Sequence, residues 1–296
     1  MVIAILPHGQ LKQSFSRLAD YPLWKLEFPL GERPQGEIIA DLTESDHLIV
    51  YSGSRAFLAS RAGMRCKMSI LLLEPPAIQY RYYQLLGWIG KRYHRILTHN
   101  SDLLSRLPNA RFVPHGGTFL NERRYYTDAK RRRISLIASK KNTTEGHRLR
   151  HKIASWSLKC AKDLNLYGYG YNPVEDKSVA HAPYWFSVVV ENSRCCGYFT
   201  EKLIDSLLCR SLPVYWGAPD IAHFFDTRGM ICCHSESEIF DTIPRLTIED
   251  YQRRLPYLEE NARRALEFAN FHYNAATVLA EEQRLSETMM PQIRVA

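Results

Sequence analysis

Short apolar runs alternate with stretches of helical periodicity along the first hundred residues. The apolar runs are 2–6, 46–51, 68–73 and 93–98. Stretches with apolar positions three or four residues apart follow them, at Leu11–Ala19, Ser54–Ala62, Ala77–Leu86 and Ser101–Leu107. Buried strands separated by short helices are typical of parallel β-α-β units. This pattern predicts a Rossmann-like half built on a parallel sheet.

A second alternation begins after a charge-dense segment. Residues Asn121–Arg133 lack apolar periodicity, as a domain linker would. Strands are expected beyond it at Ile134–Ser139, Phe186–Val190 and Leu212–Trp216, and helices at Thr144–Trp156 and Thr200–Cys209. From Ile248 to about Arg284 the pattern is helical, with Pro256 expected near a helix start. We therefore expect an α/β protein with domains at 1–130 and 131–296, the second ending in helices.

Composition narrows the class of protein. The chain has 296 residues and is 45% hydrophobic, which is enough to bury a core in each domain. The strongest apolar run stops at Glu74, far short of the roughly 18 residues that span a bilayer, so no integral membrane segment is expected. The N-terminal MVIAILPHG lacks a basic leader and reads as a buried strand, which favours a cytoplasmic location. The seven cysteines show no C-x-x-C spacing, so we expect reduced thiols and no metal site.

The positive charge is concentrated in one region. The net charge is +8, and residues 119–152 contain eleven Lys or Arg against three acids. Such an excess fits a solvated linker or a nucleic-acid patch at Arg123–Arg133. It fits equally a pocket for a small polyanion such as a nucleoside diphosphate. Charge alone leaves both interpretations open.

Several common catalytic signatures are absent from the sequence. It contains no P-loop, no complete G-x-G-x-x-G, no G-x-S-x-G and no H-E-x-x-H. Gly168 and Gly170 in LYGYGYN are expected to form a turn. His147 and His151 are four residues apart, but neighbouring arginines would repel a metal ion. No D-x-D occurs either, so a bound diphosphate would be neutralised by side chains.

Residues 185–220 contain most of the candidate functional side chains. A buried strand ends in Glu191-Asn192-Ser193, and a helix opens near Thr200 with Glu201 and Lys202 in its first turn. Polar groups at the carboxyl end of a strand, beside a helix N-terminus, favour an anion. The alternative is a simple N-cap, a first-turn acid and a solvated lysine.

Three motifs in this stretch resemble a known family. FSVVVENS, YFTEK and PVYWGAPD match the F-x-x-x-x-E-N-S, Y-x-T-E-K and P-V-x-x-G-A-P pattern of the glycosyltransferase family 10 α1,3/α1,4-fucosyltransferases. SLIASKKNTTEGHRLRHKI and ILLLEPPAI are similar to further family segments. The resemblance extends over about 65–275 and is strongest at 184–220. Pro75 departs from the family's usual Ser, and Cys195-Cys196 lies in its variable loop.

This resemblance implies a fold and a reaction. The fold would be GT-B, with two facing Rossmann-like domains, a cleft between them and a helical C-terminus; 1–130 would bind the acceptor and 131–296 the donor. The reaction would be an inverting transfer of L-fucose from GDP-β-L-fucose to a glycan hydroxyl, giving an α1,3-type linkage, in a soluble bacterial-type or viral-type enzyme. No cofactor beyond the donor substrate is expected. The donor-binding residues implied are Arg150, Asn192, Tyr198, Glu201 and Lys202.

Two assignments rest on position within an element. Glu74 ends an apolar strand, so its carboxylate should reach the carboxyl edge of the sheet and act as the general base, unless it caps the helix that follows. Arg148 and Arg150 lie roughly 200° apart around a helix, so only one of them should face a diphosphate. We favour Arg150, because the family's matching arginine precedes apolar positions like Ile153 and Trp156.

Other functions remain open at this level. They are a glycosyltransferase for another nucleotide sugar, a sugar-nucleotide-binding protein without turnover, and a basic nucleic-acid-binding protein. Acceptor contacts are expected from the loops Pro7–Gln10 and Gly53–Arg55, and neither the acceptor nor the oligomeric state follows from the sequence.

Overall fold

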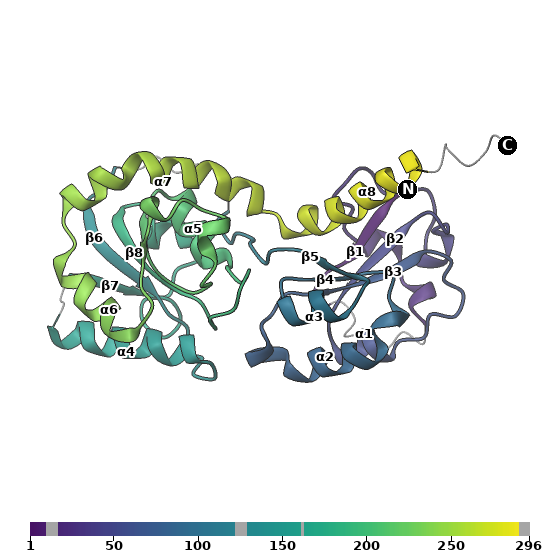
Figure 1. The fold of residues 1–296 in the computed structure, drawn as a ribbon, viewed down its shortest axis with the longest axis horizontal. Helices are drawn as coiled ribbons and strands as arrows, with labels where there is room; N and C mark the ends of the chain where they lie inside the picture. The colour runs from purple at the N-terminus through teal and green to yellow at the C-terminus, as the bar shows by residue number, and fades with distance from the viewer. Residues whose placement is uncertain (10–16, 122–128, 161–162, 290–296) are drawn as a thin grey trace. The chain divides into compact units, whose positions relative to one another are not determined.

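The chain divides into two compact units (Figure 1). The computed structural model describes residues 1–9, 17–121, 129–160 and 163–289. The first unit comprises Met1–Val113 with Phe271–Ala296, and the second Pro114–Asn270. The division therefore falls at Val113/Pro114, not at the expected 130/131. The last helix belongs to the first unit, not to the second domain as expected.

The first unit is a parallel sheet whose strands lie in sequence order. Within the described residues it contains five strands, β1 (Ile3–Leu6), β2 (His47–Tyr51), β3 (Lys67–Leu72), β4 (Ile96–Thr98) and β5 (Ala110–Phe112). Connecting helices are α1 (Ser54–Leu58), α2 (Pro76–Ile89) and α3 (Ser101–Arg106). Alternate strand residues point to opposite faces, so each face builds its own core. One core packs against α1, α2 and α3, and the other against α8 (Phe271–Met289).

Polar contacts fix α8 to this sheet as well. Glu282 of α8 accepts hydrogen bonds from Arg95, at 2.6 Å, and from Arg111. Nearer its start, His272 Nε2 lies 2.6 Å from the Tyr51 hydroxyl, and His272 Nδ1 lies 2.5 Å from Glu27 Oε2. A helix that follows the whole second unit in sequence thus completes the core of the first.

The second unit is also a parallel sheet, but its strand order reverses once. Its strands, among the described residues, are β6 (Arg132–Ile137), β7 (Leu164–Tyr167), β8 (Tyr184–Val190), β9 (Leu212–Trp216) and β10 (Ile231–Cys232), in the order β10-β9-β8-β6-β7. In such sheets ligands bind at the carboxyl ends of the strands that flank the reversal, here β6 and β8.

Helices cover both faces of this second sheet (Figure 1). They are α4 (Glu145–Cys160), α5 (Glu201–Leu208), α6 (Glu236–Thr242) and α7 (Ile248–Phe268). Trp156 of α4 packs on Phe240 of α6 with their ring centroids 5.2 Å apart, while α5 and α7 lie together on the other side. Single 3-10 turns connect many elements of both units: Leu18–Asp20, Leu23–Lys25, Ile39–Asp41, Gly90–Arg92, Lys177–Ala180, Ile221–His223, Thr227–Gly229 and Ile243–Arg245.

The strands predicted from the sequence are present in the structure. The main differences between prediction and structure concern the helices. Pro256 lies inside α7, which begins at Ile248 because Thr247 and Asp250 form a capping box there. The helical C-terminus is two helices, α7 and α8, that belong to different units. The helix expected at Ser54–Ala62 ends at Leu58. Short β5, β10 and α6 were not expected at all.

Some expectations fall on residues that are not described. These are most of the helix expected at Leu11–Ala19, Gln10 of the first acceptor loop, and residues 122–128 of the expected linker and basic run. The turn expected at LYGYGYN is present, because Gly168 follows β7 with φ +98° and its carbonyl accepts from Tyr171 N at 2.8 Å. Among the described helices, none is both long and apolar enough to cross a membrane.

Candidate active site

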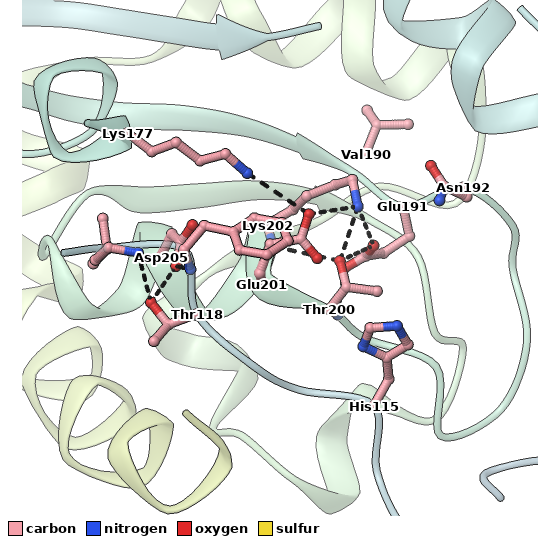
Figure 2. Close-up of polar contacts among 12 residues, drawn as sticks. His115, Thr118, Lys177, Val190, Glu191, Asn192, Thr200, Glu201, Lys202 and Asp205 are labelled. Atoms are coloured by element: carbon pink, nitrogen blue, oxygen red, sulfur yellow. Dashed lines mark hydrogen bonds and ion pairs between the residues drawn. The ribbon is translucent and has the colours of Figure 1, made fainter. Parts of the chain in front are cut away.

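A buried carboxylate joins the end of β8 to the start of α5 (Figure 2). Glu191 follows β8 directly and is fully buried. It accepts hydrogen bonds from the Thr200 backbone N–H at 2.8 Å and from the Thr200 hydroxyl at 2.7 Å. Thr200 is the N-cap of α5. The loop between the two elements is therefore closed by Glu191, which fixes the first turn of α5 at the carboxyl edge of the sheet.

That first turn carries an ion pair. Lys202 Nζ lies 3.2 Å from Glu201 Oε1 and 3.7 Å from Glu191 Oε2, and it donates to Thr200 Oγ1 at 3.0 Å. Burial alone would lower the pKa of Lys202, but Glu201 and Glu191 raise it above its usual value. Burial would raise the pKa of Glu201, yet Lys202 and then Lys177 lower it to about 2. Both side chains are charged at neutral pH.

The buried face of α4 contributes Arg150. Its guanidinium donates to the Val190 carbonyl and, at 2.9 Å, to Asn192 Oδ1. Asn192 in turn donates to the hydroxyl of the fully buried Tyr198 at 3.4 Å. Burial lowers the pKa of Arg150, while Glu191 is the foremost group opposing this. Arg150, Asn192 and Tyr198 therefore form one hydrogen-bonded chain beside the Lys202 ion pair.

Helix α4 lies close to the residues that follow β8 because position 146 is a glycine. A side chain at Gly146 would clash with the carbonyl oxygen of Glu191, and Gly146 N–H donates to the Asn192 carbonyl at 3.2 Å.

Arg148 lies on the opposite side of α4, is exposed and donates to the Thr143 carbonyl at 3.2 Å. Of the two arginines, Arg150 is thus the one that contacts Val190 and Asn192, and its contact with a diphosphate stays a prediction.

Sequence reasoning missed two charged members of this cluster (Figure 2). Lys177 lies 3.8 Å from Glu201 Oε1 and 4.1 Å from the centroid of the Phe119 ring. Asp205 is fully buried one turn after Glu201 and accepts from Thr118 Oγ1 at 2.5 Å and from Phe119 N at 3.1 Å. Burial raises the pKa of Asp205 to about 7, against the hydrogen bond from Thr118.

Asp205 could have been predicted from the sequence, whereas Lys177 could not. Lys177 lies in a single 3-10 turn without periodicity, so nothing in its neighbourhood marked it. Asp205 lies four residues after Glu201 on the same helix face, and an acid on the buried face of α5 was a usable signal. Among the residues that the structure describes, the site therefore brings together the cations Arg150, Lys177 and Lys202 around the carboxylates of Glu191 and Glu201. Such a cluster can hold a polyanion through charge-assisted hydrogen bonds.

Glu74 belongs to the first unit and stands apart from this cluster in the chain. β3 ends at Leu72, and Glu74 follows it at the carboxyl edge of the first sheet. The N-cap of α2 is Pro75, with no capping side chain, so Glu74 does not cap that helix. Its backbone carbonyl accepts from the Tyr83 hydroxyl at 2.8 Å, whereas its buried Oε2 atom has no hydrogen-bond partner among the described residues.

The described residues do not assemble a metal site. No group of three His, Cys, Asp or Glu side chains among them is arranged to hold a metal ion. His147 Nδ1 accepts from Thr144 N at 3.2 Å, and burial, helped by Arg150, lowers the pKa of His147 to about 4. His151 lies 3.2 Å from the Tyr171 hydroxyl, so the two histidines have separate partners. None of the seven cysteines is in a disulfide.

Comparison with known proteins identifies the family. Residues 127–287 match the family model for glycosyltransferase family 10 (fucosyltransferase), C-term. The chain belongs to this family. It is also similar to the alpha-(1,3)-fucosyltransferase FucT of Helicobacter pylori, with 37% identity over 65 residues. That match covers 22% of this chain and 13% of the relative, so the chain matches only a small part of the relative's length.

Solved structures extend the likeness to the fold. S. aureus TarM, crystallised with UDP among its ligands, has a TM-score of 0.53 at 12% identity, over 82% of this chain and 55% of its own. An α,α-trehalose-phosphate synthase (UDP-forming) from Burkholderia vietnamiensis has a TM-score of 0.55 at 11% identity, over 82% of this chain and 72% of its own. At these identities the likeness shows the fold alone. The expected GT-B fold and the expected family are both confirmed.

Proposed function

We propose that this chain is an inverting fucosyltransferase that transfers L-fucose from GDP-β-L-fucose to a hydroxyl of a glycan acceptor, giving an α1,3-type linkage. The observation that carries the proposal is the cluster of Arg150, Lys202 and Glu201 at the carboxyl end of β8. Membership of family 10 supports GDP-fucose as the donor.

The second unit supplies the groups that a nucleoside diphosphate sugar needs. Arg150 presents a planar fork to phosphate oxygens, and Lys202 adds a point charge beside it. Glu201, ionised because its pKa is about 2, accepts hydrogen bonds from ribose hydroxyls. Asn192 and Tyr198 extend the hydrogen-bonded chain that begins at Arg150. Lysine and arginine, not a metal ion, then neutralise the diphosphate.

The first unit supplies the base. In an inverting transfer the acceptor oxygen attacks the anomeric carbon while GDP leaves from the opposite face, so the β-linked donor gives an α-linked product. The acceptor hydroxyl must lose its proton as the new bond forms. Glu74 can accept that proton, because no residue that the structure describes donates a hydrogen bond to its Oε2 atom. Arg150 and Lys202 stabilise the negative charge that develops on GDP.

Calorimetric titration in EDTA tests the donor class. GDP and GDP-fucose should bind, while GDP-mannose, UDP-glucose and UDP-galactose separate base recognition from sugar recognition. A DNA oligonucleotide serves as the control for non-specific binding to cations. Binding of DNA without binding of GDP would favour a nucleic-acid-binding protein. Slow donor hydrolysis by the protein, measured as GDP release, then separates an enzyme from a binding protein without turnover.

A further inference from the structure

The outer side of α2 presents an aromatic ring among basic side chains. Arg81, Leu85 and Trp88 lie at i, i+4 and i+7 on its outward stripe, and Lys91 and Arg92 follow the helix. These five residues are named the α2 patch. Trp88 is 88% exposed, the three basic residues are exposed, and Leu85 is partly so. The inner side of the helix is already buried in the core through Tyr83 and Leu86, so Trp88 has no place there.

The neighbouring helix α1 also has an exposed apolar side chain. Phe57 of α1 packs against Tyr82 of α2 with ring centroids 5.2 Å apart, and the next residue, Leu58, is 84% exposed. Both helices lie on the same side of the first sheet (Figure 1). A single exposed Leu is ordinary, so Leu58 adds one exposed apolar side chain on the adjacent helix to the exposed Trp88 of the α2 patch.

Charge in this region has one sign. Residues 47–101 contain eight Lys or Arg and a single acid, Glu74. Glu74 precedes the first turn of α2, whereas Trp88 is in its last turn, so they lie about 20 Å apart along a helix that rises roughly 1.5 Å per residue. On the adjacent α3, Asp102 is 2.8 Å from Arg106 and is neutralised by it. The α2 patch therefore has an uncompensated positive charge.

We propose that the α2 patch docks this protein on an anionic lipid surface. Arg81, Lys91 and Arg92 bind lipid phosphates, while the Trp88 ring and Leu85 enter the boundary between headgroups and acyl chains. Lys and Arg with Trp and Leu are the combination that such interfaces select. Nucleic acid would use the cations but leave the exposed Leu58 and Leu85 without partners. A lipid surface satisfies both kinds of group.

This docking leaves the catalytic edge of the first unit free. Trp88, Lys91 and Arg92 lie at the end of α2 remote from Glu74, which stands at the carboxyl edge of the sheet. A lipid surface bound by the α2 patch would hold the enzyme in place without covering Glu74. The inference is independent of the donor and acceptor that the site uses.

Vesicle co-sedimentation of the full chain tests the proposal. The probes are vesicles of phosphatidylcholine alone, vesicles of phosphatidylcholine with phosphatidylglycerol, and a DNA oligonucleotide of equal charge concentration. We expect binding to the mixed vesicles only, decreasing with salt. Lys91→Glu/Arg92→Glu should weaken it about tenfold or more, because each cation near an anionic surface contributes to attachment. Trp88→Ser should weaken it about fivefold and remove the blue shift of tryptophan emission on binding.

Matched variants of the second unit provide the controls. Lys159→Glu/Arg253→Glu makes the same charge change on exposed helix positions, and Leu158→Ser removes an exposed apolar side chain. Both should bind vesicles as the parent does. Absence of binding to mixed vesicles, equal loss in the control variants, or patch-dependent binding of DNA but not of vesicles would each overturn the proposal. Melting temperatures of all variants show that the loss is not unfolding.

Discussion

Arg150 of α4 donates a 2.9 Å hydrogen bond to the side-chain oxygen of Asn192, the second residue after β8. This bond orients the guanidinium, since its other branch is held by the Val190 carbonyl. The helix and the strand end are thus coupled through one arginine.

The first prediction concerns Arg150 and its neighbour on the helix. Arg150→Lys keeps the charge but loses the planar fork, so GDP affinity should fall about tenfold or more. Arg148→Lys is the matched control, because Arg148 is exposed and should leave affinity unchanged. Calorimetry gives both dissociation constants, and thermal unfolding reports any loss from the bonds to Val190 and Asn192. Equal effects of the two changes would show that Arg150 does not contact the diphosphate more closely than Arg148 does.

The second prediction concerns the lysines beside Glu201. Lys202→Met should weaken GDP binding about tenfold or more, because a charge-assisted bond to phosphate is lost. Lys177→Met should have a smaller effect, since Lys177 is 3.8 Å from Glu201 and lies over Phe119. The exposed Lys152→Met, on α4, is the control. If Lys177→Met were the more damaging change, the diphosphate would lie on the Phe119 side of Glu201.

Metal removal is the third test. Arg150, Lys177 and Lys202 can neutralise a diphosphate, and the sequence has no D-x-D. GDP should therefore bind with the same affinity in EDTA and in magnesium or manganese, and weaken as salt is added. A dissociation constant that rises sharply in EDTA and recovers with added metal would exclude neutralisation by side chains alone.

The sequence predicted the fold well because its strands are short apolar runs that end sharply. β9 was predicted to the residue at Leu212–Trp216. β5 and β10 were missed, since three and two residues carry too little pattern to recognise. The place of α8 was missed for a different reason. Amphipathic periodicity shows that a helix has an apolar face, but not which sheet buries it.

The candidate site was predictable where one motif carried it. Asn192, Glu201 and Lys202 lie within a short stretch, so their convergence followed from a strand and a helix meeting at one edge. The role of Glu191 as the tie between β8 and Thr200 required three-dimensional contacts. Identifying Lys177 as part of the site also required three-dimensional contacts, because a separate 3-10 turn brings it to Glu201.

The fourth prediction is a dependence of stability on pH that arises at Asp205. Its pKa rises from 3.8 to about 7 on burial, so the folded chain binds its proton more tightly than the unfolded chain. Asp205 therefore costs stability as pH rises from about 4 to about 7, and the cost is constant above that. Asp205→Asn keeps an oxygen to accept from Thr118 and Phe119 but does not titrate.

Thermal and urea unfolding of both proteins measure this effect. The difference in free energy of unfolding, Asp205→Asn minus parent, should increase by about 2 kcal/mol as the pH rises from about 5 to about 8. Asp220→Asn, which removes a carboxylate that accepts from Gly197 N–H elsewhere in the second unit, is the control. A constant difference between Asp205→Asn and the parent would mean that Asp205 is ionised throughout this range.

The last prediction separates the two glutamates by the constant that each affects. Glu74→Gln keeps the shape of the side chain but cannot take a proton, so kcat should fall about 100-fold or more while GDP affinity is unchanged. Glu201→Gln loses a charged acceptor for ribose in ground and transition states alike, so it should raise the KM for the donor with a smaller change in kcat. Steady-state kinetics with GDP-fucose, on any acceptor that supports turnover or on water, gives both constants for both variants. Glu32→Gln, on an exposed acid of the same unit, controls for general effects of the substitution. Turnover of Glu74→Gln at the parental rate would exclude Glu74 as the base, and Glu44 or Asp46 would become the next candidate.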